Sequence, residues 1–273
     1  MSTSSINTNT GALIALQNLN ATNRALETTQ NRVNTGLKVA TAKDNGAIFA
    51  IATNQRADMA ALDAVKTSVQ RGRSVMDVAM AAGETVVEAL KEMKALAISI
   101  EDFNPAPAAG TNPSYDAYVA DYVALQEEIT ESLAGASFDG VNLFASPAAK
   151  MTIRTGLDVG ETQDIGFFDN AGAANWTAPT LTAMTSAGVQ TAIESFSSSM
   201  ATLGTQSKSL DRKLVFLGKL QDSLETGVGN LVDADLAKES AKLSALQTKQ
   251  QLGVQALSIA NQAPQMILSL FKG

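Results

Sequence analysis

Apolar residues recur every three or four positions over most of the chain, which is the pattern of helices that pack along one face. The first such stretch begins at Ala12, after an N-terminus rich in Ser, Thr and Asn. Its seam is apolar apart from two amides and comprises Leu16, Leu19, Asn23, Leu26, Gln30, Val33 and Leu37. Polar residues in a seam lower the stability of a helix pair, so we expect this helix to need partners.

A second and much longer helix is predicted over residues 46–100. Gly36 is placed to cap the first helix, and Thr41 with Asp44 has the spacing of a capping box ahead of the second. Small and aliphatic residues then repeat every seven positions, and the predicted rod core on this helix is Leu62, Val69, Met76 and Leu90. A helix of this length spans roughly 80 Å, which predicts a rod rather than a globular domain.

The middle of the chain is predicted to hold one short helix and a β insert. Pro105 and Pro107 end the long helix, and a third helix follows from Tyr115 to Ala136. Residues 151–154 and 163–167 have the composition of two short strands in a hairpin. We expect residues 171–185, which are small and polar, to form a loop.

The remaining sequence, from about Gly188, is predicted to be helical almost to its end. It contributes Leu214, Leu217 and Leu224 to the rod core. The apolar seam slips by one residue at 232–235, where we expect a bend or a domain boundary. It continues through Leu236, Leu243, Leu246 and Leu257. Matching seams at the two ends of the chain predict an antiparallel pair, so the fold class is mainly α: a long, coiled-coil-like antiparallel rod with a small β-hairpin insert.

Composition removes several classes of function. The chain has no Cys and no His, which excludes disulfides, Cys/His zinc sites, thiol nucleophiles and the commonest general base. We find no phosphate loop, dinucleotide fingerprint or nucleophile elbow, so we predict no enzymatic activity, no catalytic or metal-binding residue and no cofactor. No apolar run is long enough for membrane insertion.

Charge is unevenly distributed along the chain. Residues 1–100 carry a net charge of +2, residues 101–170 of −10 and residues 171–273 of +1. A nucleic-acid partner would need a basic face, so none is predicted. The acidic middle is instead expected to face water, with the nearly neutral ends meeting other protein.

Four segments resemble bacterial flagellins, and they occur in the family's order. They are Ser5–Asn9 with Ala12–Asn20, Arg32–Asn45, Ser137–Phe144 and Ala260–Phe271. The resemblance implies a subunit that polymerises with itself into the flagellar filament for swimming, of a short type without outer variable domains. Residues 1–43 and 229–273 would form the inner terminal domain, and residues 44–228 a rod-like domain with a β-hairpin near 138–170.

The resemblance also implies partners, an export route and a modification. The partners are the flagellar export apparatus, an export chaperone, and the hook-associated and cap proteins. The polar N-terminus has no signal-peptide pattern, so we expect type III export to the extracellular filament without cleavage. Met266 and Leu270 complete the expected assembly interface. The candidate O-glycosylation residues are Thr177, Thr180, Thr182 and Ser186.

Two other functions remain open at the level of sequence. A hook–filament junction protein shares the terminal pattern, and self-assembly of the purified chain separates it from a filament subunit. An intracellular coiled-coil scaffold would explain the seams but not the four ordered segments.

Overall fold

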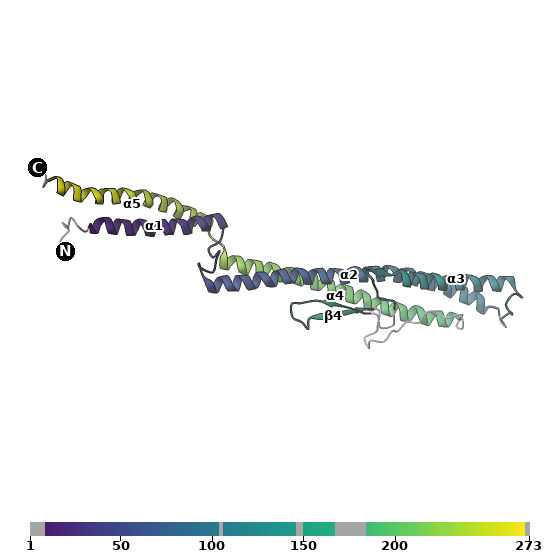
Figure 1. Ribbon diagram of the computed structural model, residues 1–273. Coiled ribbons are helices and arrows are strands. Elements are labelled where there is room, and N and C mark those ends of the chain that lie inside the picture. Colours follow the sequence, from purple (N-terminus) through teal and green to yellow (C-terminus); the bar gives the residue numbers. More distant parts are fainter. Residues whose placement is uncertain (1–8, 104–105, 146–149, 167–183, 271–273) are drawn as a thin grey trace. The chain divides into compact units, whose positions relative to one another are not determined.

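The computed structural model describes residues 9–103, 106–145, 150–166 and 184–270, with side chains described as far as residue 262. It divides into two compact units, residues 1–57 with 223–273, and residues 58–222. The chain is mainly α-helical, in the order α1 (Thr10–Thr35), α2 (Gly46–Glu101), α3 (Pro113–Gly135), α4 (Ser186–Val232) and α5 (Leu236–Leu270). Two small hairpins lie between α3 and α4 (Figure 1). The predicted fold class is confirmed.

Helix α2 supplies the core of the unit at residues 58–222. Two columns of residues recur every seven positions along it, one from Leu62 to Ala97 and one from Val65 to Ile100, and every residue in both columns is buried. Helix α4 runs antiparallel beside it (Figure 1). Their register is fixed by polar contacts along the pair: Gln221 donates to Asp63 at 3.0 Å, Arg73 pairs with Asp211 at 3.0 Å, and Lys94 donates to Gln190 at 2.7 Å. The predicted rod-core leucines on α4 differ in burial: Leu217 is buried, whereas Leu214 and Leu224 are half-buried.

Helix α3 begins two residues before its predicted start. The side chain of Asn112 accepts from the backbone N–H groups of Ser114 and Tyr115, and Pro113 occupies the first position, where a missing N–H costs nothing. The apolar face buries Tyr122 and Ile129 completely. Burial raises the pKa of the Tyr122 phenol, and its hydroxyl has no hydrogen-bond partner among the described residues.

We expect Tyr122→Phe to stabilise the rod. The substitution removes a buried polar group that makes no hydrogen bond in the described part of the chain and keeps the aromatic ring. An unsatisfied buried hydroxyl costs about 1–3 kcal/mol, so the free energy of unfolding should rise by about 1 kcal/mol in a urea titration. Tyr118→Phe is the matched control, because Tyr118 lies on the same helix and is 37% exposed. A loss of stability in Tyr122→Phe would contradict the expectation.

A short hairpin follows α3, and the pattern of apolar and polar residues did not predict it. Strands β1 (Ser137–Phe138) and β2 (Val141–Asn142) pair antiparallel across Asp139 and Gly140, which both have positive φ, 51° and 74°. An Asp-Gly pair between strands is the usual signal for such a two-residue turn. The turn signal was therefore present in the sequence. Each strand is only two residues long, however, which is too short for an alternation of apolar and polar residues to be recognised.

The hairpin predicted at residues 151–154 and 163–167 is confirmed, and it packs on α2. Strands β3 (Lys150–Arg154) and β4 (Thr162–Gly166) pair antiparallel, and Ile153 and Ile165 are fully buried. Gly72 makes this packing possible, since a Cβ there would lie 2.8 Å from Cγ2 of Ile153. Hydrogen bonds from Lys150 and Thr152 lower the pKa of Asp164, which joins the two strands.

Two local predictions about helix ends had different outcomes. Gly36 caps α1 in the left-handed conformation, with φ 71°, and its N–H donates to the Arg32 carbonyl at 2.9 Å, as predicted. The prediction that Thr41 and Asp44 form a capping box for α2 was wrong. Asp44 accepts hydrogen bonds from the N–H and the hydroxyl of Thr41 and closes a separate turn before the helix. Helix α2 is capped instead by Asn45, whose side chain accepts from two backbone N–H groups at 3.1 Å.

The expected break near the C-terminal seam is also present. Helix α4 ends at Val232 and α5 begins at Leu236. Asp235 caps α5, because its side chain accepts from the Lys238 N–H at 3.1 Å. The loop predicted at 171–185 lies almost wholly outside the described residues.

Candidate assembly interface

The two ends of the chain form one antiparallel helical hairpin, α1 with α5 (Figure 1). Asn9 starts it: its side-chain oxygen caps α1 at Ala12, and its amide nitrogen donates to the Ala260 carbonyl at 2.7 Å. Asn23 accepts from Gln250 at 2.8 Å near the middle. The matching seams of the sequence therefore predicted the correct pairing of the ends.

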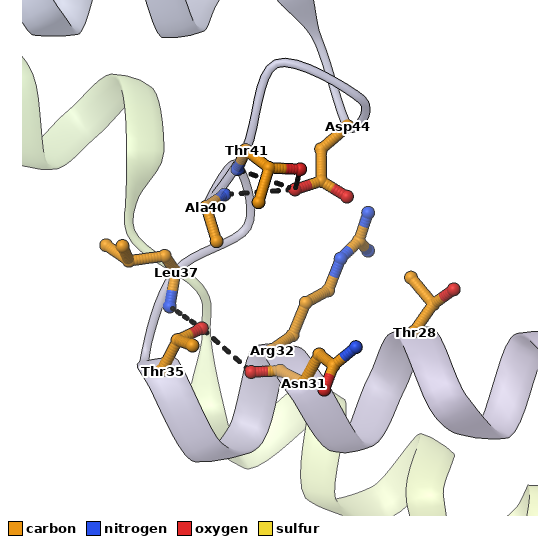
Figure 2. A pocket seen from close by; sticks show the side chains of 8 residues that line it. All are labelled: Thr28, Asn31, Arg32, Thr35, Leu37, Ala40, Thr41 and Asp44. Atoms are coloured by element: carbon orange, nitrogen blue, oxygen red, sulfur yellow. Dashed lines mark hydrogen bonds between the residues drawn. The ribbon is translucent and has the colours of Figure 1, made fainter.

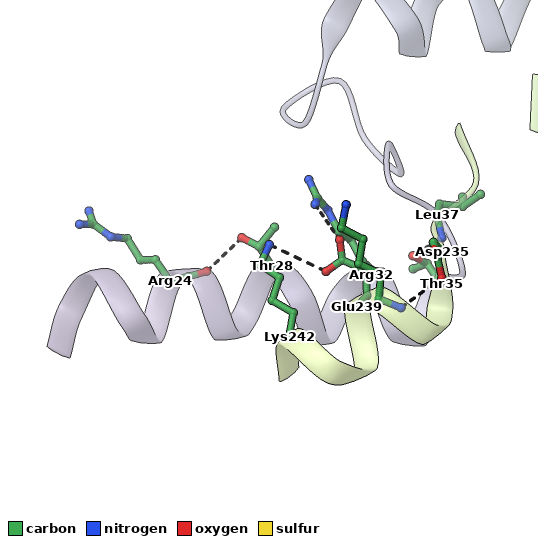
Figure 3. A network of polar contacts seen from close by, with 9 residues as sticks. Arg24, Thr28, Arg32, Thr35, Leu37, Asp235, Glu239 and Lys242 are labelled. Carbon is green, nitrogen blue, oxygen red and sulfur yellow. Dashed lines mark hydrogen bonds and ion pairs between the residues drawn. The ribbon is translucent and has the colours of Figure 1, made fainter. Parts of the chain in front are cut away.

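An ion pair fixes the other end of the hairpin. Arg32 on α1 pairs with Glu239 on α5 at 3.2 Å, and Lys242 approaches the same carboxylate at 3.9 Å (Figure 3). The Glu239 side chain is only 12% exposed, so solvent screens the Arg32 pair less than it would a surface pair.

The contact between α1 and α5 mixes apolar side chains with small and polar ones. One column of α1 that faces α5 consists of Ala15 and Thr22, which are half-buried, and Thr29, which is fully buried with no partner for its hydroxyl among the described residues. The helices approach closely at Gly253, where a Cβ would lie 3.2 Å from Cδ1 of Leu19. Small and polar residues allow this approach but bury less apolar area than leucines would, so this column adds little to the stability of the hairpin.

The predicted interface residues divide between the inside and the outside of the hairpin. Half-buried or buried positions are Leu19, Leu26, Val33, Leu37, Leu243, Leu246 and Leu257. Exposed positions are Leu16, Asn23, Gln30 and Leu236. Met266 and Leu270 lie outside the residues whose side chains are described.

Large apolar side chains cover the outside of the hairpin. Leu13 is 61% exposed, Ile14 59%, Leu252 58%, Val254 54% and Ile259 69%. None of these was among the predicted interface residues, because those residues follow one seam on each helix and these side chains lie off it. A helix that is apolar on more than one face needs more than one packing partner. The hairpin is therefore an incomplete bundle.

A compact turn joins α1 to the following segment. Leu37 bridges to Asp233, the Lys38 N–H donates to the Val232 carbonyl at 2.6 Å, and the Ala234 N–H donates to the Gly36 carbonyl at 2.9 Å. Backbone and hydroxyl hydrogen bonds from Thr41 lower the pKa of Asp44. Figure 2 shows Arg32 and Asp44 lining a hollow of about 190 Å³ beside this turn.

Two other features, a metal-ligand cluster and a membrane-spanning helix, are absent from the part of the chain that the structure describes. No three His, Cys, Asp or Glu side chains there are grouped to hold a metal ion. None of the helices searched is long and apolar enough to cross a membrane.

The hairpin and the rod define a class of protein, an elongated helical subunit whose paired ends leave apolar side chains exposed. Comparisons with known proteins agree. The model of the bacterial flagellin N-terminal helical region matches residues 6–149, and that of the C-terminal helical region matches residues 187–271. Flagellin FljK of Caulobacter vibrioides is 49% identical, with 100% of both chains covered. A flagellin of Brucella melitensis is 38% identical, covering 98% of this chain and 99% of the relative.

The chain belongs to the bacterial flagellin family. It is therefore a structural subunit of the bacterial flagellar filament, which serves motility. A crystal structure of Bacillus cereus flagellin is 19% identical, and the match covers 65% of this chain and 94% of that one with a TM-score of 0.32.

Proposed function

We propose that the terminal hairpin drives polymerisation of this subunit. In the filament, residues 1–43 and 229–273 form the inner domain and residues 44–228 the rod-like domain. The boundaries between the two compact units of the free chain fall elsewhere, after residue 57 in α2 and after residue 222 in α4. The observation that carries the proposal is the row of exposed apolar side chains on the outer faces of α1 and α5, which neighbouring copies would cover. We propose no enzymatic role.

Seeded growth tests this proposal. Purified full-length chain is added to sheared filament fragments, and electron microscopy follows fragment length. We expect elongation from the seeds with this chain alone, because the same hairpin surfaces recur on every copy. A chain that binds seeds once and stops elongation would instead be a junction protein, and a chain that does not associate would contradict the proposal.

The subunit is also proposed to leave the cell uncleaved. Its flagellar export apparatus and chaperone would act on a chain whose ends remain unassembled, and the hook-associated and cap proteins would bound the growing filament. The first residues are polar and carry no basic or apolar run of a cleaved signal. The resemblance to flagellins supports this route.

Sugars are proposed on the segment that precedes α4. Thr177, Thr180 and Thr182 lie outside the described residues. Ser186 is described, and its hydroxyl donates to Glu101 at 2.7 Å while its N–H donates to the same carboxylate at 2.8 Å. A glycan on Ser186 would replace the first of these hydrogen bonds, so the three threonines are the better candidates.

Intact-mass measurement of native filament protein tests export and modification together. We expect the 28.4 kDa chain to be intact, apart from loss of Met1, with added sugar mass on a peptide containing residues 177–186. A mass equal to the unmodified chain would contradict glycosylation. Loss of about twenty N-terminal residues, the size of a signal peptide, would contradict uncleaved export.

A further inference from the structure

Two exposed surfaces of the unit at residues 58–222 carry opposite charge. The first is a groove of about 490 Å³ between α2 and α3. Its apolar lining consists of Ala95, Leu96, Ala124 and Leu125. Three carboxylates, those of Glu92, Asp121 and Glu128, also line it. All three residues are exposed, and none makes an ion pair within the described part of the chain. We call this surface the acidic groove.

The second surface is a stripe along the outer face of α4. It consists of Lys208, Arg212, Val215, Phe216 and Lys219, which recur at the spacing of one helix face, and all five are exposed. Val215 is 58% exposed and Phe216 55%. The Nζ atom of Lys213 lies 5.6 Å from the centroid of the Phe216 ring, which adds a further positive charge beside it. We call this surface the basic stripe.

The two surfaces lie at different places along the same rod. Contacts of Asp211 with Arg73 and of Gln221 with Asp63 put the basic stripe beside residues 63–73 of α2. The acidic groove lies at residues 92–96 of α2, roughly 40 Å further along at about 1.5 Å per residue. A groove therefore cannot reach the stripe of its own rigid rod, and contact between them requires a second copy.

We propose that the acidic groove of one subunit receives the basic stripe of a second subunit in the filament. Val215 and Phe216 would cover the apolar lining of the groove, while Lys208, Arg212 and Lys219 would meet the three carboxylates. The contact joins two different surfaces, so each added copy leaves one groove and one stripe open, and the interaction repeats into an open polymer. This inference rests on the proposed polymerisation and assigns a second contact to it, outside the terminal hairpin.

Charge reversal on each side tests the contact in full-length protein. Glu92→Lys with Glu128→Lys should raise the critical concentration for seeded growth at least tenfold, and Lys208→Glu with Arg212→Glu should do the same. Combining all four substitutions should bring the value back to within about threefold of the unmodified chain, because attraction is restored with the signs exchanged. The four side chains are exposed, so thermal melting of the monomer should be unchanged.

The matched control is Glu84→Lys with Glu127→Lys, which makes the same change of net charge at exposed positions that do not line the groove. It should grow like the unmodified chain. The inference would be overturned if the groove variant grew like this control, or if the variant with all four substitutions had a critical concentration as high as either pair alone. Either result would leave the proposal that the terminal hairpin drives polymerisation intact. Failure of the unmodified chain to grow on seeds would instead overturn the proposed function itself.

Crosslinking gives a second measurement. The chain has no Cys, so Ala124→Cys and Phe216→Cys introduce the only thiols, one in the acidic groove and one in the basic stripe. In filaments, a short bismaleimide should link the doubly substituted chain into a ladder of covalent multimers by forming a thioether at each end. Either single variant should stay monomeric. Absence of a ladder in filaments of the double variant would count against the contact.

Discussion

Deletion of residues 240–273 is expected to abolish polymerisation and leave a soluble helical rod. The deletion removes most of α5, and with it the partner of α1 and one of the two exposed apolar surfaces. The unit at residues 58–222 keeps its own core of α2, α3, α4 and the two hairpins, so it should retain cooperative melting. Deletion of residues 1–30 should have the same effect, since α5 loses its partner.

Point substitutions separate assembly from folding in this prediction. Ile14→Asp and Ile259→Asp place a charge where the free subunit is already exposed, so monomer stability should change by less than about 0.5 kcal/mol. Growth on seeds should nevertheless stop, because each carboxylate would be buried without a partner in the filament. Gln17→Asp is the control, since Gln17 is an exposed polar residue on the same helix. Normal filaments from either deletion or from Ile259→Asp would show that another surface drives assembly.

Gly72→Leu is expected to displace the β3–β4 hairpin from the rod. A Cβ at this position would lie 2.8 Å and 2.9 Å from two carbons of Ile153, and a larger side chain would occupy its site. Displacement exposes Ile153 and Ile165, which are both fully buried, and each is worth about 1.5–3 kcal/mol when removed from water. The free energy of unfolding should therefore fall by about 3 kcal/mol or more, and amides of residues 150–166 should lose protection from hydrogen exchange.

Gly218→Leu is the matched control for this substitution. Gly218 is also a glycine inside a long helix, but nothing lies within 4 Å of the position its Cβ would take. Leucine favours a helix over glycine by about 0.5–1 kcal/mol, so this variant should be at least as stable as the unmodified chain. Equal effects of the two substitutions would show that Gly72 is not required for docking of the hairpin.

The long helices and the buried face of α2 were predictable because they depend on long, regular patterns. Both columns of α2 keep a sevenfold repeat over the whole rod, and every position of both is buried. Gly36 was likewise identifiable, since a left-handed helix end favours glycine whatever surrounds it. Shorter patterns predicted local structure less well. Thr41 and Asp44 have the spacing of a helix cap but form their own turn, and the adjacent Asn45 caps α2 instead.

The inner face of α1 shows what only tertiary structure decides. The set Leu16, Asn23 and Gln30 and the column Ala15, Thr22 and Thr29 differ by one position, and the free subunit leaves all three residues of the first set exposed. Periodicity cannot separate two adjacent columns on a helix that is apolar on more than one side. The choice depends on the close approach at Gly253 and on the pairing of Arg32 with Glu239, both made by a helix more than 200 residues away in the chain. The sequence by itself determined that the ends are paired helices, whereas the tertiary structure decided which faces are filled by this pairing and which stay exposed in the free subunit.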